Sequence, residues 1–393
     1  MKTNQFYTAE SVTEGHPDKL CDLIADSVLD ECLSHDALSR VACEVMATRG
    51  QIIVAGEITS LYEPSIPSIV RSVLRKVGYN PSRFAIQCLI HKQSPDIAAG
   101  VDCSLELRRG RTDGNPVLEM GAGDQGVMVG YACSETPQML PLPVVLAHRL
   151  TSALTIARKS GAIQGLRPDG KAQVTVEYVN GKPKRVKTIV VSVQHDKDKD
   201  LDVLKSEIIA EVLHPVFTKF PFDGDTEILV NPSGRFVEGG PKADTGLTGR
   251  KLMVDTYGGL GAHGGGAFSG KDPTKVDRSG AYMARCIAKN IVFAELADEC
   301  QVAISYAIGK ADPVAVQIDT FGTGKVSDEV LAKAVNDVFH MRPAAIINEF
   351  CLRNCSFAEY STYGHFGNGY PTWEQTDKYR ELREAVKRYE DND

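Results

Sequence analysis

Residues 41–59 read VACEVMATRGQIIVAGEIT, and their pattern predicts a β-hairpin. Residues 41–47 and 52–59 are two runs rich in valine, isoleucine and alanine, as is typical of strands. The polar tripeptide Thr48-Arg49-Gly50 separates the runs and supplies the turn.

Helices and a further strand flank this hairpin. Before it, apolar residues recur at helical spacing after Pro17 and Asp18, which suit the first turn of a helix. After it, residues 66–77 predict a helix that ends at Gly78, and residues 83–91 predict a buried strand. The first third of the chain therefore has the order helix, strand, strand, helix, strand.

The same order recurs twice. The second copy has a helix, two strands, a helix and a strand, over residues 144–159, 173–179, 185–194, 201–213 and 227–230. The third has a helix, two strands and two helices, over residues 276–296, 301–308, 314–321, 328–339 and 344–353. The repeat predicts an α+β fold of three pseudo-symmetric α/β-sandwich domains, over residues 1–118, 119–238 and 239–393. Coincidence is the alternative, because this order of elements is common. Helices would cover one face of each sheet, so the sheets are expected to pack at a dimer interface.

Composition narrows the function classes. The 393 residues are too many for one ordinary core, and 42% hydrophobic with 24% charged residues is typical of globular chains. The formal net charge of −7 argues against a nucleic-acid partner, and no apolar run is long enough to span a membrane. The N-terminus lacks a signal core, and ten cysteines without a C-x-x-C motif indicate a reduced, cytoplasmic chain without a zinc site.

A glycine-rich, basic segment carries the densest functional signal. Residues 234–280 hold 13 of the 35 glycines, together with seven lysines and arginines. Glycine allows a backbone to approach a ligand closely, and residues 265–271 have the phosphate-loop spacing G-x-x-x-x-G-K. Asp272 stands where that motif needs Ser or Thr, so the segment predicts a polyphosphate cradle other than a standard P-loop. The alternative is a flexible surface loop with solvated lysines.

Further candidates lie outside this segment. His16 is placed at the start of the first helix, where free N–H groups favour an anion, although a lone histidine is more often structural. Glu44 and Glu57 interrupt apolar strands, where a carboxylate either faces solvent or binds a cation or amine. Asp124 and Asp169 lie in turn-rich loops, where an aspartate often serves only to form the turn. No nucleophile–base motif accompanies them, so these residues alone indicate a polyphosphate and divalent-metal site of unspecified reaction.

Seven segments in order resemble the S-adenosylmethionine synthetase (methionine adenosyltransferase) family over nearly the whole chain. The segments are EGHPDK (14–19), QSPDI (93–97), GAGDQG (121–126), LRPD (166–169), GLTGRK (246–251), GGGAFSGKD (264–272) and YGHFG (363–367). Two departures occur: residues 93–124 are longer than expected of the family, and Gln164-Gly165-Leu166 replaces its Pro-Trp-Leu.

The resemblance implies an enzyme that transfers the adenosyl group of ATP to the sulfur of L-methionine. The product is S-adenosyl-L-methionine, and the triphosphate is then hydrolysed to pyrophosphate and phosphate. The implied cofactors are two Mg²⁺ per site and K⁺. The implied assembly is a homodimer or homotetramer with active sites between subunits.

The resemblance also implies a role for individual residues. The expected catalytic residues are His16, Lys171, Arg250 and Lys271. The expected ATP-binding residues are His16, Asp169, Lys171, Arg235, Phe236, Asp244, Arg250, Lys251, Ala267 and Lys271. The expected methionine-binding residues are Glu57, Gln93, Asp244 and Lys275. The expected metal ligands are Asp18 and Asp277 for Mg²⁺ and Glu44 for K⁺.

This chemistry explains why the chain needs no general base. A thioether sulfur has no proton to lose when it attacks carbon, so catalysis depends on positioning and on stabilising the departing triphosphate. Two alternatives remain at this point: a kinase or ATPase that uses the near-P-loop, and a non-catalytic homologue that only binds nucleotide.

Overall fold

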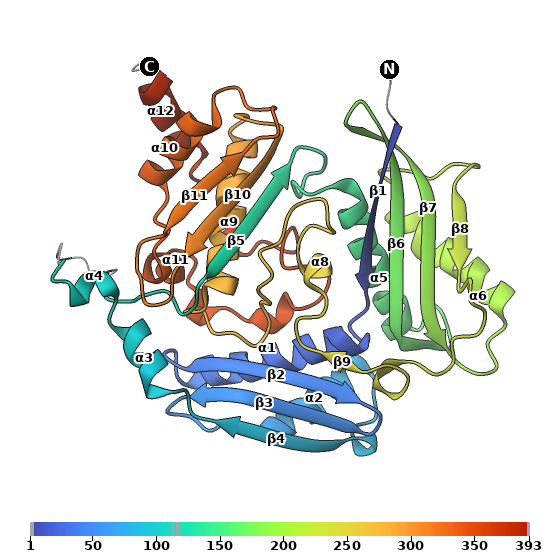
Figure 1. The fold of residues 1–393 in the computed structure, drawn as a ribbon. Coiled ribbons are helices and arrows are strands. Elements are labelled where there is room, and N and C mark those ends of the chain that lie inside the picture. Colours follow the sequence, from blue (N-terminus) through green and yellow to red (C-terminus); the bar gives the residue numbers. More distant parts are fainter. Residues whose placement is uncertain (1–3, 112–113, 115–117, 391–393) are drawn as a thin grey trace.

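The computed structural model describes residues 4–111, 114 and 118–390 (Figure 1). Three units of sheet and helices lie around α8 (Leu252–Asp255) and its loop, as Figure 1 shows. This arrangement confirms the prediction of three mixed α/β units.

The first unit contains the predicted hairpin. Its strands are β2 (Arg40–Thr48), β3 (Gln51–Thr59) and β4 (Ala85–His91), and its helices are α1 (Pro17–His35) and α2 (Ile66–Val77). Alternate residues of β2 are buried on the face that α1 covers, whereas Glu44 is exposed on the opposite face. The helices therefore cover one face of this sheet and leave the other open.

The second unit has a long central hairpin. Its elements are α5 (Leu142–Ser160), β6 (Leu166–Val179), β7 (Lys182–His195), α6 (Leu201–Ile208), a π-helical turn (Ile209–Leu213), α7 (His214–Val216) and β8 (Glu227–Val230). The predicted strands 173–179 and 185–194 are parts of β6 and β7. β7 begins earlier than predicted because the turn Asn180-Gly181, with φ of 55° and 73°, lets both strands pair up to it. β6 begins earlier, at Leu166, because its first residues pair with the far end of β7.

The third unit packs its sheet on a long helix. Its elements are α9 (Val276–Phe293), β10 (Glu299–Tyr306), β11 (Ala315–Asp319), α10 (Asp328–Val338), α11 (Pro343–Glu349) and α12 (Tyr379–Glu390). Between the first and second units, α3 (Pro95–Asp102) and α4 (Leu105–Arg108) lie within residues 93–124, the stretch that is longer than expected of the family. The remaining short elements are 3₁₀ turns, over Pro81–Arg83, Gly240–Lys242, Leu352–Asn354, Phe357–Glu359 and Thr372–Glu374.

Each sheet also contains a strand that the repeat did not predict, drawn from another part of the chain. β1 (Asn4–Val12) pairs with β6, β5 (Gly126–Cys133) pairs with β10, and β9 (Gly246–Leu247) pairs with β2. The sheet orders are therefore β4-β3-β2-β9, β1-β6-β7-β8 and β11-β10-β5. The three units exchange edge strands, while the boundaries 1–118, 119–238 and 239–393 stay a prediction.

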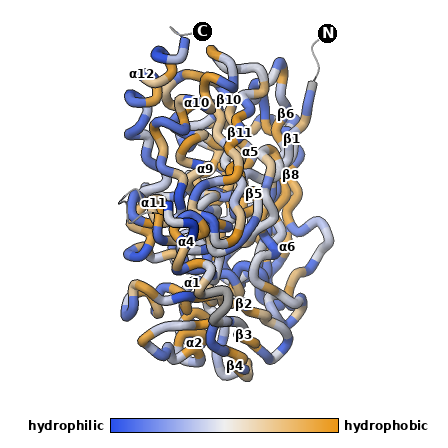
Figure 2. The backbone as a smooth tube through the Cα atoms, turned by 60° about the vertical axis from the view of Figure 1, so that its left-hand side comes forward, coloured by the Kyte–Doolittle hydropathy of each residue, from blue (hydrophilic) through white to orange (hydrophobic). Residues whose placement is uncertain are grey.

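Two hydrophobic cores hold these units. One core joins α1, β2 and α2 of the first unit to α9, β10 and α10 of the third, and the other lies within the second unit. Figure 2 shows that hydrophobic residues run through all three units rather than gathering in one of them. No helix among the described residues is long and apolar enough to cross a membrane.

We expect Gly130→Ala to destabilise the third unit. Gly130 lies in β5 directly against α9, and a Cβ at this position would come within 1.9 Å of the Ala284 carbonyl carbon. Strand and helix would have to separate, which costs about 3 kcal/mol of unfolding free energy by analogy with overpacked cores. Denaturant unfolding measures the change. Gly224→Ala is the control because a Cβ there meets nothing within 4 Å, and equal stability of the two variants would contradict the prediction.

Candidate active site

The turn before α1 lies against the start of β6. The Thr13 amide donates to the Gly170 carbonyl over 2.9 Å, and the Thr13 hydroxyl donates to the Pro168 carbonyl over 2.7 Å. A Cβ on Gly15 would lie 2.4 Å from that of Pro168, so the two backbones touch where only glycine fits. The EGHPDK and LRPD segments, about 150 residues apart in sequence, therefore form one surface.

His16 is the N-cap of α1, as the sequence predicted. Its Nδ1 accepts the Asp18 amide N–H over 3.2 Å, which places the ring proton on Nε2. Burial and the neighbouring Lys251 lower the pKa of His16 to about 3. The imidazole is therefore neutral at pH 7 and presents Nε2–H as a hydrogen-bond donor.

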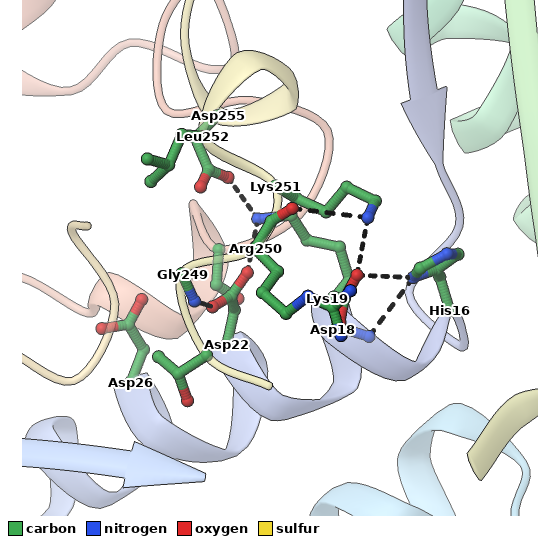
Figure 3. Close-up of polar contacts among 12 residues, drawn as sticks. His16, Asp18, Lys19, Asp22, Asp26, Gly249, Arg250, Lys251, Leu252 and Asp255 are labelled. Atoms are coloured by element: carbon green, nitrogen blue, oxygen red, sulfur yellow. Dashed lines mark hydrogen bonds and ion pairs between the residues drawn. The ribbon is translucent and has the colours of Figure 1, made fainter. Parts of the chain in front are cut away.

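Asp18 lies close to His16 and forms ion pairs with two neighbouring cations, Lys251 and Arg250 (Figure 3). Its Oδ2 is 2.6 Å from Lys251 Nζ, its Oδ1 is 4.0 Å from Arg250 Nη1, and the Leu247 amide donates to Oδ1 over 3.0 Å. Burial alone would raise the pKa of Asp18, but Lys251 and the Leu247 amide hold the pKa below its ordinary value. The carboxylate is thus charged and paired.

The expected ATP-binding residues of the second unit lie beside this cluster. Asp169 Oδ2 accepts the Gly240 amide over 2.7 Å, and burial raises the Asp169 pKa to about 6. Asp244 lies just after the 3₁₀ turn Gly240–Lys242, and its negative charge also raises the pKa of Asp169. Lys171 is half-exposed on β6.

The Arg235-Phe236 dipeptide follows β8 in sequence and lies beside His195, the last residue of β7. The His195 amide donates to the Phe236 carbonyl over 2.9 Å, and the Phe236 amide donates to the His195 ring at Nε2 over 3.0 Å. The Phe236 ring packs beside Gly239. Arg235 is exposed and donates to the Lys197 carbonyl over 2.9 Å. Together with His16, Asp18, Lys171, Asp169, Asp244, Arg250 and Lys251, these residues form what we call the first group.

A second group gathers around the glycine-rich segment. Lys271 Nζ is 2.6 Å from Asp277 Oδ2, and the backbone of Lys271 forms a β-bridge with Ala42 at the edge of β2 that faces away from β3. Gly266 packs against Asp277 so closely that a Cβ would lie 2.0 Å from Asp277 Oδ1.

The carboxylates of the first sheet complete this second group. Glu44 lies opposite Ala55 on the open face, and Glu57 lies 2.9 Å from His91 Nε2. Desolvation raises the pKa of Glu44, against the opposing effect of Lys271, which places these two groups near each other. Gln93 follows β4, and its backbone amide donates to the Thr59 hydroxyl over 3.2 Å.

Lys275 and Ala267 close the second group. Lys275 is the residue before α9 and pairs with Asp272 over 2.5 Å, and Ala267 packs against Gly249. The GAGDQG segment reaches the same place, since the Gly123 amide donates to the Thr274 carbonyl over 3.2 Å. The helix begins four residues after Asp272, which confirms that this loop is not a standard P-loop.

The two groups stay separate within one chain. Among the described residues, no hydrogen bond or ion pair joins a side chain of the first group to one of the second. Each expected Mg²⁺ carboxylate instead pairs with a lysine of its own group, Asp18 with Lys251 and Asp277 with Lys271.

Two other charged residues of the EGHPDK segment, Glu14 and Lys19, form ion pairs within the fold. Glu14 pairs with Arg158 and Lys159, and Lys19 is fully buried between Asp22 and Asp255. The lone loop acid Asp124 is exposed and caps the next amide, that of Gln125.

Sequence reasoning missed several residues that shape the site. Tyr79 donates to the Gly15 carbonyl over 2.6 Å, and Asp22 and Asp26 accept backbone amides from the cation-bearing loops. The repeated spacing of aspartates along α1 was the signal that could have found the last two.

Oxygen donors of this kind suit a hard divalent cation. Mg²⁺ is commonly bound through one or two carboxylates and the phosphates of its substrate, which leaves the protein few ligands to supply. Asp18 and Asp277, which lie beside Lys251 and Lys271, fit that requirement. No group of three or more histidine, cysteine, aspartate or glutamate side chains in the described part of the chain has metal-binding geometry.

Comparison with known proteins agrees with this organisation. Models of the N-terminal, central and C-terminal domains of S-adenosylmethionine synthetase match residues 4–95, 119–236 and 238–375. An S-adenosylmethionine synthase of Desulforudis audaxviator (strain MP104C) is 52% identical over 388 residues, which cover 96% of this chain and 98% of that protein. The chain therefore belongs to the S-adenosylmethionine synthetase family.

Proposed function

We propose that this chain transfers the adenosyl group of ATP to the sulfur of L-methionine, forms S-adenosyl-L-methionine, and then hydrolyses the triphosphate to pyrophosphate and phosphate. The observation that carries the proposal is the placement of Arg250 and Lys251 against Asp18 and the neutral His16 at the start of α1. A helix start, two cations and a hydrogen-bond donor at one point suit a leaving triphosphate.

The chain's own residues divide the work of the transfer. His16 donates its Nε2–H toward the oxygen of the breaking C5′–O bond, which gains negative charge as the bond lengthens. Lys171, Arg250, Lys251 and Lys271 neutralise the triphosphate. Asp169, Arg235, Asp244 and Ala267 contact ATP, and Phe236 stacks on adenine.

Methionine is recognised through both of its charged ends. Lys275 suits the carboxylate, Glu57 and Asp244 suit the ammonium, and Gln93 supplies a neutral hydrogen-bonding group. The sulfur needs no base, in agreement with the lack of a nucleophile–base motif in the sequence.

The family needs a divalent metal ion, and we assign two Mg²⁺ per site to Asp18 and Asp277 and one K⁺ to Glu44. Bound cations of this kind supply positive charge to the triphosphate. Lys251 and Lys271 pair with these two aspartates, so a metal ion bound by each aspartate would leave its lysine available to phosphate.

The separation of the two groups supports an active site between subunits of a homodimer or homotetramer. The open face of the first sheet carries Glu44, Glu57 and the 52%-exposed Leu89. A second copy packed on this face would cover Leu89 and bring its first group toward the second group of its partner. Three contiguous domains and a cytoplasmic location complete the proposal.

We expect product formation to require methionine and Lys271. With ATP and Mg²⁺, the wild type should release pyrophosphate and phosphate with a sulfonium product only when methionine is present. Lys271→Ala should lower kcat about 100-fold or more, as loss of a transition-state charge contact does, with little change in Tm. Lys219→Ala, at an exposed lysine, is the control. Formation of ADP would instead support a kinase, and an unchanged kcat in Lys271→Ala would remove this residue from the mechanism.

We expect Gly266→Ala to weaken activation by Mg²⁺. The new methyl group must displace the Asp277 carboxylate, because its Cβ would lie 2.0 Å from Oδ1. The Mg²⁺ concentration for half-maximal activity should rise about 10-fold or more, as when a metal ligand loses its orientation. A Mg²⁺ titration of activity measures the shift, with Gly224→Ala as control. An identical Mg²⁺ dependence in both variants would contradict the assignment of Asp277.

We expect two inactive variants to restore activity when they are mixed. Arg250→Ala damages the first group and Lys271→Ala the second, so a mixed dimer has one intact site and one doubly damaged site. Unfolding and refolding equal amounts together should restore about one quarter of wild-type activity, because half the dimers are mixed and half of their sites are intact. Each variant refolded alone is the control. No recovery from an efficiently refolded mixture would place both groups of each site in one chain.

A further inference from the structure

Four aspartates follow one face of α1 at intervals of four residues: Asp18, Asp22, Asp26 and Asp30. Residues at this spacing lie above one another on a helix surface. Each of these carboxylates accepts at least one backbone amide from a distant segment, at Leu247, Gly249, Gly270 and Phe357 respectively, and we call the set the aspartate ladder.

Two rungs of the ladder hold the residues that precede the phosphate-binding cations. Asp22 Oδ1 accepts the Gly249 amide over 2.9 Å, and Gly249 directly precedes Arg250 and Lys251, as Figure 3 shows. Asp26 Oδ1 accepts the Gly270 amide over 2.9 Å, and Gly270 directly precedes Lys271. Both aspartates are fully buried, so these contacts are shielded from solvent.

Buried cations neutralise the same two aspartates. Lys19 lies between Asp22 and Asp255, at 2.9 Å from Asp22 Oδ2, and Arg278 pairs with Asp26. Arg278 also donates its Nε to the Lys271 carbonyl over 2.9 Å. One ion pair therefore fixes the Ser269–Gly270 and Lys271–Asp272 peptide units, which lie before and after the Gly270–Lys271 unit.

Hydrogen bonds to β2 fix the same loops from the other side. The Cys43 amide donates to the Gly270 carbonyl over 2.9 Å, and the Thr248 amide donates to the Val45 carbonyl over 3.0 Å. Each loop is therefore clamped between α1 and β2, and Arg250, Lys251 and Lys271 directly follow the clamped residues.

We propose that Asp22 and Asp26 are positioning residues, which set the direction of the triphosphate-binding cations through the amides of Gly249 and Gly270. The inference rests on the proposed function for the roles of those cations. Neither aspartate touches substrate, so their effect passes through the loops.

Asp30 supplies a matched control within the same ladder. It accepts the amides of Phe357 and Ala358 over 2.8 and 2.9 Å, and this segment carries none of the expected site residues. Loss of Asp30 removes helix-to-backbone contacts of the same kind without disturbing a cation-bearing loop.

The test compares Asp22→Ala, Asp26→Ala, Asp26→Asn and Asp30→Ala with the wild type. Thermal unfolding gives Tm, and calorimetry with inorganic tripolyphosphate and Mg²⁺ gives an affinity that does not depend on adenosyl transfer. Steady-state assays with ATP and methionine give kcat and KM at a temperature below every Tm.

All alanine variants should have a lower Tm, but only those at Asp22 and Asp26 should bind tripolyphosphate about 10- to 100-fold more weakly, with a similar loss in kcat/KM for ATP. Asp30→Ala should stay within about 2-fold of wild type in both. Asp26→Asn should stay within about 3-fold, because its Oδ1 can still accept both the Gly270 amide and the Arg278 guanidinium, which share that atom in the wild type.

Wild-type affinity in Asp22→Ala would overturn the proposal, and so would an equal loss in Asp30→Ala. If Asp26→Ala does not fold, the comparison of Asp22→Ala with Asp30→Ala decides. A wild type that binds tripolyphosphate but makes no sulfonium product would refute the proposed function and leave the positioning test intact.

Discussion

The structure depends on one requirement: a charge that leaves water must find a partner. Helix α1 buries Asp22, Asp26 and Lys19 completely, which would be costly for isolated ions. Each finds an opposite charge and, for the aspartates, a backbone amide from a distant loop. Satisfying these groups draws residues 247–270 onto the first unit, and the site forms where those loops meet the helix.

The same requirement explains the pairing of charges within the candidate site. Lysines and arginines that converge would repel one another if they were unpaired. Here Lys251 and Lys271 pair with Asp18 and Asp277, while Arg250 and Lys171 keep substantial exposure to water. The carboxylates thus offset the charge of the neighbouring lysines, which allows a densely charged site within an acidic chain of net charge −7.

Local patterns in the sequence predicted the local features well. The hairpin at residues 41–59, the N-cap His16 and the non-P-loop character of residues 265–271 all follow from neighbouring residues, and all occur. The sequence patterns did not predict the edge strands β1, β5 and β9, because each of these strands pairs with a partner far along the chain. β9 has only two residues, and its pairing with Met46 and Ala47 follows from the anchoring of the adjacent loop on α1. For the same reason, Asp22 and Asp26 read as ordinary polar positions of an amphipathic helix until the loops that they hold are in place.

The exchange of edge strands has a consequence for the order of folding. β1 includes the first described residues, yet Asn4 pairs with Val179 and Val12 with Lys171. Even the nearest of these partners in sequence, Lys171, follows Val12 by 159 residues. The strand β1 is therefore synthesised long before the strand with which it pairs. The first sheet likewise waits for Leu247, and β5 waits for β10. Contacts of such long sequence separation slow folding and leave strand edges open during synthesis. No sheet is thus complete until a strand from another part of the chain has been made, so the three units do not mature independently of one another as they emerge.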